Sequence, residues 1–203
     1  MHHKPNTQTI IRYGEDETHG AVTSVATAAG HDGTPPDPDD WRRDAERGGG
    51  ALYDMGVYPT NAARHATGME PVAVTGRTWS ERDEMYSEVP EFAEFTLEFP
   101  GGVTATGTAS FGASMNYLQV ECTEGGYQLR PFQAYSGVQG TTSDGTRLPP
   151  DPTDQQARQM DNDARAIKND NAPLVPGREG LADVRVVRAI MESSANDGAR
   201  MEL

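Results

Sequence analysis

A strict alternation of apolar and polar residues is the clearest pattern in the chain. Residues 94–99 alternate glutamate or threonine with phenylalanine or leucine, and residues 103–111 alternate small or apolar residues with threonine and serine. Period-two alternation is typical of strands that bury one face, and Pro100-Gly101-Gly102 between the two segments is a turn signal. The two segments therefore predict an antiparallel hairpin with one threonine-rich face.

The rest of the chain divides into segments of strand or helical period. β-Branched and aromatic residues predict strands, whereas apolar residues three or four positions apart predict helices. Leu181, Val184, Val187 and Ile190 recur on one helical stripe. The expected elements are helices over residues 6–13, 51–67, 153–168 and 178–196, strands over 21–28, 71–80, 91–99, 103–111, 117–123 and 127–130, and loops over 30–40 and 136–152.

The order of these elements indicates a single α+β domain over residues 1–203. A run of strands followed by two closing helices is typical of an open, mainly antiparallel sheet with helices packed on one face. The threonine-rich face then lies on the side without helices. Water, a partner domain or a second copy of the same sheet would each cover it.

The chain is strongly acidic, with a net charge of −14 and a pI near 4.6. Among its 17 cationic residues, only Lys4 and Lys168 are lysines. An acidic surface with few lysines predicts a protein of a halophile cytosol, where molar salt screens carboxylate repulsion within about 3 Å. The same charge disfavours nucleic acid and anionic membranes as partners, and it favours a small neutral or cationic substrate.

Several kinds of site and segment find no support in the sequence. No apolar run approaches the roughly 18 residues of a membrane span, and the start Met1-His2-His3-Lys4-Pro5-Asn6 lacks a hydrophobic signal region, so we expect a soluble, cytoplasmic protein. The histidines lack metal-site spacing, which predicts no bound metal and a packing role for His65. Cys122 alternates with Leu118 and Val120, which predicts a core thiol without a catalytic role.

Two blocks of residues carry a family resemblance. They are Trp41-Arg42, Gly48-Gly49-Gly50, Asp54-Met55-Gly56-Val57-Tyr58 and Thr67-Gly68-Met69-Glu70-Pro71 in the first block, and Pro176-Gly177-Arg178 through Asp183-Val184-Arg185 in the second. In this order and spacing they resemble the family of glucose-fructose oxidoreductase, inositol dehydrogenase and related sugar dehydrogenases. The resemblance implies the C-terminal domain of an NADP- or NAD-dependent enzyme, which binds substrate and forms homo-oligomers through its open sheet face.

Tyr58 is the catalytic residue that the resemblance implies. The common family pattern is Asp-x-Gly-x-His, whereas Asp54-x-Gly56-x-Tyr58 resembles the branch of glucose-fructose oxidoreductase and pentose dehydrogenases. There the phenol takes or relays the proton of the sugar C1 hydroxyl while the C1 hydride passes to nicotinamide. A free phenol ionises near pH 10, so this role requires a cation or a hydrogen-bond donor that stabilises the phenolate.

The dinucleotide-binding parts of the family find no match in the sequence. The family places a supporting lysine in a Glu-Lys-Pro motif, but Lys4-Pro5 follows His3. No expected strand leads into Gly-x-Gly-x-x-Gly, the loop that holds a pyrophosphate at a helix N-terminus. We therefore expect that the chain begins within a longer protein, holds no cofactor-binding residues and is inactive alone.

Four further residues are candidates for the same site, and three of them have a structural alternative. Asp54 binds a sugar hydroxyl or orients the phenol, or is only a first-turn aspartate after the glycines. Trp41 and Arg42 wall the sugar site or anchor a loop, and Asn61 binds substrate. Pro59 is expected to kink the helix and re-aim the phenol.

These residues lead to one main interpretation and two alternatives. The main one is the substrate domain of an NAD(P)-dependent dehydrogenase that oxidises an aldose, a pentose or a hexose, at C1 to the lactone. An alternative is a non-catalytic module that self-associates or docks onto a paralogue. A third interpretation keeps the enzyme class with an inositol, a diol or a tetrapyrrole as substrate.

Overall fold

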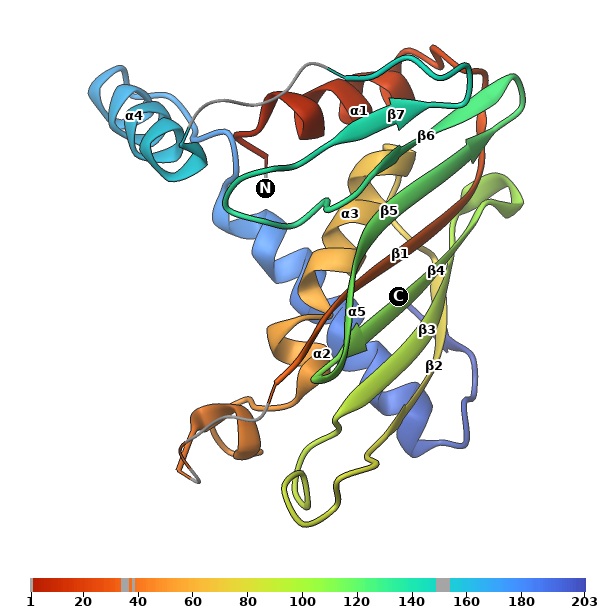
Figure 1. Cartoon of the computed structure of the whole chain (residues 1–203), viewed down its shortest axis with the longest axis vertical. Helices are drawn as coiled ribbons and strands as arrows, with labels where there is room; N and C mark the ends of the chain where they lie inside the picture. The colour runs from red at the N-terminus through yellow and green to blue at the C-terminus, as the bar shows by residue number, and fades with distance from the viewer. Residues whose placement is uncertain (1, 34–36, 38, 149–153) are drawn as a thin grey trace.

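The computed structural model describes residues 2–33, 37, 39–148 and 154–203, which form one sheet with helices on one side (Figure 1). The strands are β1 (Val22–Asp32), β2 (Ala73–Trp79), β3 (Phe92–Glu98), β4 (Thr104–Ser110), β5 (Gly112–Cys122), β6 (Gly125–Leu129), β7 (Gly140–Thr142) and β8 (Met201–Glu202). The α-helices are α1 (Pro5–Glu15), α2 (Ala51–Asp54), α3 (Val57–Thr67), α4 (Gln155–Lys168) and α5 (Gly177–Ala195), and Trp41–Arg43 forms a short 3-10 turn, η1.

The sheet order is β7-β6-β5-β1-β4-β3-β2-β8. β1 pairs in parallel with β4, and the other neighbouring strands pair antiparallel. The hairpin expected from the alternation is β3–β4, with Phe95 opposite Gly107. The predicted α+β class, an open and mainly antiparallel sheet with helices on one face, is therefore confirmed.

Helices α1, α3 and α5 lie against the same face of the sheet (Figure 1). α3 contacts both β1 and α1, and its buried alanines Ala62, Ala63 and Ala66 are small side chains that permit close packing. α5 buries Val187 and Ile190 completely against β2. Burial of this apolar surface is the main force that holds the layers together.

Two glycines make room for bulky groups on the helix-covered face. Phe95 pairs across the sheet with both Gly76 and Gly107. A Cβ atom at Gly107 would overlap the Phe95 ring, and one at Gly76 would lie 2.7 Å from a methyl group of Ile190. Glycine inside a strand here marks close approach of a neighbouring group.

The helix predicted over residues 51–67 is broken between α2 and α3. Met55 and Gly56 form the break, where a Cβ at Gly56 would lie 2.5 Å from the Leu52 carbonyl oxygen. Pro59 lies in the first turn of α3, where a helix does not need the missing N–H, so the kink expected at Pro59 is wrong. The break instead lies just before α3, so that Tyr58 is in the first turn of a new helix.

The apolar stripe predicted for α5 is only half correct. Val187 and Ile190 are buried, whereas Leu181 and Val184 are 51% and 40% exposed. In the first turns of α5 the side chain that faces α3 is instead Asp183, whose carboxylate accepts hydrogen bonds from Asn61 and Arg64. Polar contacts between two helices therefore set the rotation of this end of α5.

Some short or marginal segments differ from the sequence-based expectations. β7 lies inside the loop expected over residues 136–152, β8 lies after the last expected helix, and β1 continues to Asp32 into the loop expected over 30–40. Strands of two or three residues carry no detectable period. The parts of the expected loops and helix at residues 34–36, 38 and 149–153 lie outside the described residues. α4 buries only Ala166 and projects from the sheet in Figure 1.

Candidate active site

Tyr58 is the second residue of α3 and is half-buried directly after the break. Its phenol is influenced by Asp54, Gln133 and Tyr135. Burial is the largest cause that raises the pKa of Tyr58 above its usual value, and the Asp54 carboxylate and Tyr135 raise it further. The Gln133 side chain acts in the opposite direction and lowers it. Within the described part of the chain, no cation contributes to this balance.

Asp54, the last residue of α2, is paired with Arg42. Nε of Arg42 donates to Oδ2 of Asp54 at 2.8 Å, and this hydrogen bond raises the pKa of Arg42. Asp40 accepts from the Arg42 backbone N–H at 2.8 Å, and the guanidinium lies 4.6 Å from the Trp41 ring centre. The structure thus brings the predicted residues Trp41, Arg42 and Asp54 together, and Arg42 orients Asp54.

The three glycines before α2 fold the chain back onto η1. Gly48 and Gly50 have positive φ angles of 75° and 98°, a region that favours glycine. The backbone N–H of Gly49 donates to Asp44 at 2.8 Å and that of Gly50 donates to Arg42 at 2.9 Å. A Cβ at Gly49 would lie 2.7 Å from the Trp41 and Arg42 carbonyl oxygens. The glycines therefore position Trp41 and Arg42, and their N–H groups are directed inward.

Asn61 lies one turn after Tyr58 but is buried among protein groups. Its Nδ2 donates to Oδ2 of Asp183 at 2.8 Å, and its Oδ1 lies 2.8 Å from Nε2 of His2. Both ends of the amide are therefore engaged within the chain. Its predicted contact with substrate stays a prediction.

Arg64, two turns after Tyr58, is a buried cation at the centre of an ionic network. It is 3% exposed at its side chain and lies 2.5 Å from Asp183, 2.6 Å from Glu70 and 3.3 Å from Glu179. Burial acts to lower the pKa of Arg64, but the hydrogen bonds that it donates to Glu70 and Asp183 outweigh burial and raise the pKa. The network joins α3 to α5, and its contacts between the two helices had no signature in the sequence, because Glu179 and Asp183 lie more than a hundred residues after Arg64.

His65 and His2 adjoin this network. Their rings meet edge to face with centroids 4.1 Å apart, and Nε2 of His65 lies 3.6 Å from Glu179. Burial, followed by the neighbouring His2 and Arg64, lowers the pKa of His65 to about 4. These contacts agree with the packing role expected for His65.

Gln133 and Asn116 are site residues that the sequence analysis missed. Gln133 lies in the loop after β6, and Asn116 of β5 hydrogen-bonds the backbone of that loop. A single glutamine in a polar loop has no period and no motif, so only the fold reveals its neighbour Tyr58.

The cysteine, the possible metal ligands and the helices of the described residues give no sign of another kind of site. Cys122 is half-buried at the end of β5, and burial raises the pKa of its thiol. No group of three or more histidine, cysteine, aspartate or glutamate residues in the described part of the chain is arranged to hold a metal ion. No helix there is long and apolar enough to cross a membrane.

Two solved structures share this fold over the whole chain. The crystal structure of aldose-aldose oxidoreductase from Caulobacter crescentus, complexed with glycerol, superposes with a TM-score of 0.90 and 32% identity over 100% of this chain and 62% of that chain. A putative dehydrogenase from Bordetella bronchiseptica has a TM-score of 0.80 at 18% identity over 100% of this chain and 68% of its own, a likeness of fold alone.

Sequence comparison places the chain within one family. Residues 7–128 match the model of the GFO/IDH/MocA C-terminal domain, and the chain therefore belongs to the GFO/IDH/MocA family. D-xylose 1-dehydrogenase [NADP(+)] of Haloarcula marismortui is 34% identical over 80% of this chain and 47% of its own length. D-xylose 1-dehydrogenase (NADP(+)) 2 of Haloferax volcanii is 32% identical over 91% of this chain and 57% of its own length. The chain thus spans about half the length of these curated relatives.

Proposed function

We propose that this chain is the substrate-binding domain of an NAD(P)-dependent sugar dehydrogenase that oxidises an aldose at C1. The observation that carries the proposal is the position of Tyr58 beside Asp54, which Arg42 holds at the break between α2 and α3. The two NADP-dependent xylose dehydrogenases among its relatives support a pentose as substrate, and they favour NADP over NAD.

In the proposed reaction, the C1 hydroxyl loses a proton and C1 loses a hydride, so that C1 and its oxygen form the lactone carbonyl. Oη of Tyr58 receives the proton as general base. Burial and Asp54 both oppose the phenolate, so a cation from outside the described residues must stabilise it. Asp54 accepts a hydrogen bond from a sugar hydroxyl, Trp41 supplies an aromatic wall, and Asn61 is retained as a proposed substrate contact.

The residues described do not fit a dinucleotide cofactor. The inward N–H groups of Gly49 and Gly50 leave no cradle for a pyrophosphate, and the α2 that follows has only 4 residues. NADP, the hydride acceptor, would be held by a separate dinucleotide-binding domain. The chain alone is then inactive.

The test is aldose oxidation by this chain joined to a dinucleotide-binding domain, in molar salt with NADP or NAD. With an aldose deuterated at C1, we expect deuterium to appear in the reduced nicotinamide, whereas the 203-residue chain alone gives no reduction. Absence of aldose-dependent reduction in the joined protein, or deuterium retained in the sugar product, would contradict the proposal.

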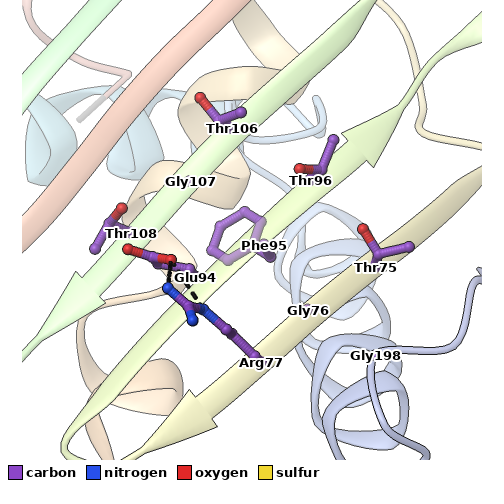
Figure 2. Close-up of a pocket in the computed structure, with 10 residues that line it drawn as sticks. All are labelled: Thr75, Gly76, Arg77, Glu94, Phe95, Thr96, Thr106, Gly107, Thr108 and Gly198. Atoms are coloured by element: carbon purple, nitrogen blue, oxygen red, sulfur yellow. Dashed lines mark hydrogen bonds and ion pairs between the residues drawn. The ribbon is translucent and has the colours of Figure 1, made fainter.

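The open face of the sheet supports a second candidate function, a self-associating or paralogue-docking module. Thr75, Thr96, Thr106 and Thr108 line a shallow hollow of about 450 Å³ on that face beside the Arg77–Glu94 ion pair (Figure 2). Thr106 is exposed and the other three threonines are partly exposed, and such a polar strand face suits contact with a second copy of the same face. Light scattering in molar salt tests this, because Thr106→Arg would then convert an oligomer to a monomer, and a monomeric native chain would contradict it.

The acidic composition leads to a proposal on conditions and location. A net charge of −14 and relatives from two halophilic archaea support function in a salt-rich cytosol. Dialysis to low salt should therefore unfold the chain as monitored by circular dichroism. A fold that stays intact without salt would contradict this.

A further inference from the structure

The loop that joins β2 to β3, residues 80–91 and here called the β2–β3 loop, is closed at its base by one buried carboxylate (Figure 1). Oε2 of Glu91 accepts from the backbone N–H groups of Glu81 and Arg82, each at 2.9 Å, and Oε1 accepts from Nε of Arg82 at 2.5 Å. The Glu91 backbone N–H donates to Oγ of Ser80 at 3.2 Å. Both ends of the loop are therefore bound together at Glu91, which is only 1% exposed.

The turn between β4 and β5 fixes this base to the sheet. The Phe111 backbone N–H donates to the Glu91 carbonyl at 3.0 Å, and the Phe111 carbonyl accepts from Nη2 of Arg82 at 2.7 Å. A Cβ atom at Gly112 would lie 2.5 Å from Oε1 of Glu91, so the carboxylate is closely enclosed. Because a buried carboxylate is costly without compensation, the ion pair keeps the base of the loop in this one position.

The fixed end of the β2–β3 loop contacts the start of α2. The carbonyl of Pro90, which precedes Glu91, accepts from the Ala51 backbone N–H at 2.9 Å. This N–H lies in the first turn of α2, where a helix offers it no carbonyl, and Gly50 before it has no side chain. A Cβ atom at Gly50 would lie 3.1 Å from Cδ of Pro90 and 3.3 Å from Cβ of Val89. The loop therefore supplies both a hydrogen-bond acceptor and close packing where α2 begins.

The start of α2 is bonded to both members of the ion pair of the candidate site. The Gly50 backbone N–H donates to the Arg42 carbonyl at 2.9 Å, and the Gly50 carbonyl accepts from the Asp54 backbone N–H at 3.2 Å. The helix has only 4 residues, so a shift at Ala51 carries through to Asp54. The contact with Pro90 therefore bears on the position of the Asp54 carboxylate beside Arg42.

We propose that Glu91 is a positioning residue, which fixes the β2–β3 loop so that the Pro90 carbonyl holds the start of α2. Through α2 it keeps Asp54 in place beside Arg42. The consequence for substrate rests on the proposed function, in which Asp54 accepts a hydrogen bond from a sugar hydroxyl. The hold on α2 is a property of the 203-residue chain itself and is measured without activity.

Hydrogen exchange of the Ala51 backbone N–H, followed by NMR, measures this hold. Glu91→Gln removes the charge that pairs with Arg82 and places an NH₂ group among N–H donors, so the base of the loop should loosen. Once the Pro90 carbonyl is displaced, the Ala51 N–H opens to water. Its exchange should then be about 10-fold faster than in the native chain.

Two control variants separate this effect from charge and from global stability. Glu94→Gln changes another glutamate of β3, whose partner Arg77 is exposed, and should leave the Ala51 exchange rate at its native value. Leu129→Ala removes a buried side chain from β6, on the other side of the sheet, and lowers stability away from the loop. Because Ala51 exchanges by local opening, its rate should stay near native there as well.

Ser80→Ala is a milder variant of the same loop base. It removes the acceptor of the Glu91 N–H and a donor 3.3 Å from the Val89 carbonyl, and it should speed Ala51 exchange about 3-fold. Circular dichroism checks that each variant is folded. An unchanged Ala51 rate in folded Glu91→Gln, or in Ser80→Ala if Glu91→Gln does not fold, would overturn the proposal. An equal acceleration in Leu129→Ala would overturn it too.

Kinetics of the chain joined to a dinucleotide-binding domain distinguish this proposal from the proposed function. In Glu91→Gln the KM for the aldose should rise about 10-fold with kcat changed less than about 3-fold, because Asp54 binds substrate whereas Tyr58 lies on α3 beyond the break. If the native joined protein oxidises no aldose, the proposed function fails while the exchange result stands. If it is active and Glu91→Gln keeps the native KM, the positioning role of Glu91 fails and the proposed function stands.

Discussion

The two ends of α3 each carry a polar side chain that is buried or half-buried, but the charges around these two side chains differ. Toward its C-terminal end, Arg64 is almost fully buried and lies within 3.3 Å of three carboxylates, those of Glu70, Glu179 and Asp183. At its start, Tyr58 is half-buried with a raised pKa, and the one charged neighbour that acts on it within the described residues is the anionic Asp54. The positive charge of Arg64 is therefore balanced by carboxylates, whereas the surroundings of Tyr58 oppose ionisation of its phenol.

This difference separates groups that stabilise the fold from a group available for chemistry. A compensated buried charge contributes to stability only while every partner is present. A phenol whose ionisation is opposed becomes a base only when a further group supplies the missing compensation, and burial with perturbed pKa is common at functional sites. Substitutions at the two ends should therefore affect different measurements.

The largest expected effect on stability comes from Arg64→Leu. The substitution leaves Asp183 buried without its cation, so the free energy of unfolding should fall by about 3–5 kcal/mol. Chemical denaturation in molar salt measures it. Arg77→Met is the control, since its ion pair with Glu94 is exposed and should change the free energy by less than about 1 kcal/mol. Equal decreases in the free energy of unfolding for the two variants would contradict a stabilising role of the Arg64 network.

A smaller effect is expected from the protonation of His65. Its pKa is about 4 in the folded chain, below the value of 6.5 for a free imidazole, so the unfolded chain binds more protons between these values. His65 therefore does not change the free energy of unfolding above pH 6.5. As the pH falls from 6.5 to 4, its protonation lowers that free energy by up to about 3 kcal/mol, and below pH 4 it causes no further decrease. The free energy of unfolding of His65→Gln against pH should lack this component, and parallel curves for both proteins would contradict it. His2, whose pKa is also lowered by burial, titrates in the same direction and stays in both proteins.

Arg42→Met should affect activity more than stability. Without Nε of Arg42 at 2.8 Å, Asp54 loses its orientation, and kcat/KM of the joined protein should fall about 10- to 100-fold. Arg43→Met is the matched control, because Arg43 hydrogen-bonds the Met85 carbonyl and should leave activity near its native value. Steady-state kinetics with an aldose would contradict the assignment if both variants behave alike.

The sequence predicted the regular elements of the fold better than the contacts of the site, because only regular elements impose a period on the sequence. Alternation over residues 91–111 specified the β3–β4 hairpin, because one buried face imposes a period of two. The break at Gly56 depends on a close contact with Leu52, and no period encodes it. Tyr58 was found through a motif, whereas Gln133 approaches it only through tertiary structure. The pairing of Asn61 with Asp183 is equally remote in sequence, which is why Asn61 was expected only at the substrate.

The most direct test of the account is the kcat/KM of Tyr58→Phe in the chain joined to a dinucleotide-binding domain, with an aldose and NADP in molar salt. Loss of a general base at the reacting oxygen predicts a decrease of about 100- to 10,000-fold, with a free energy of unfolding close to that of the native protein. A Tyr58→Phe protein that is folded and oxidises the aldose at the native rate would contradict the central claim.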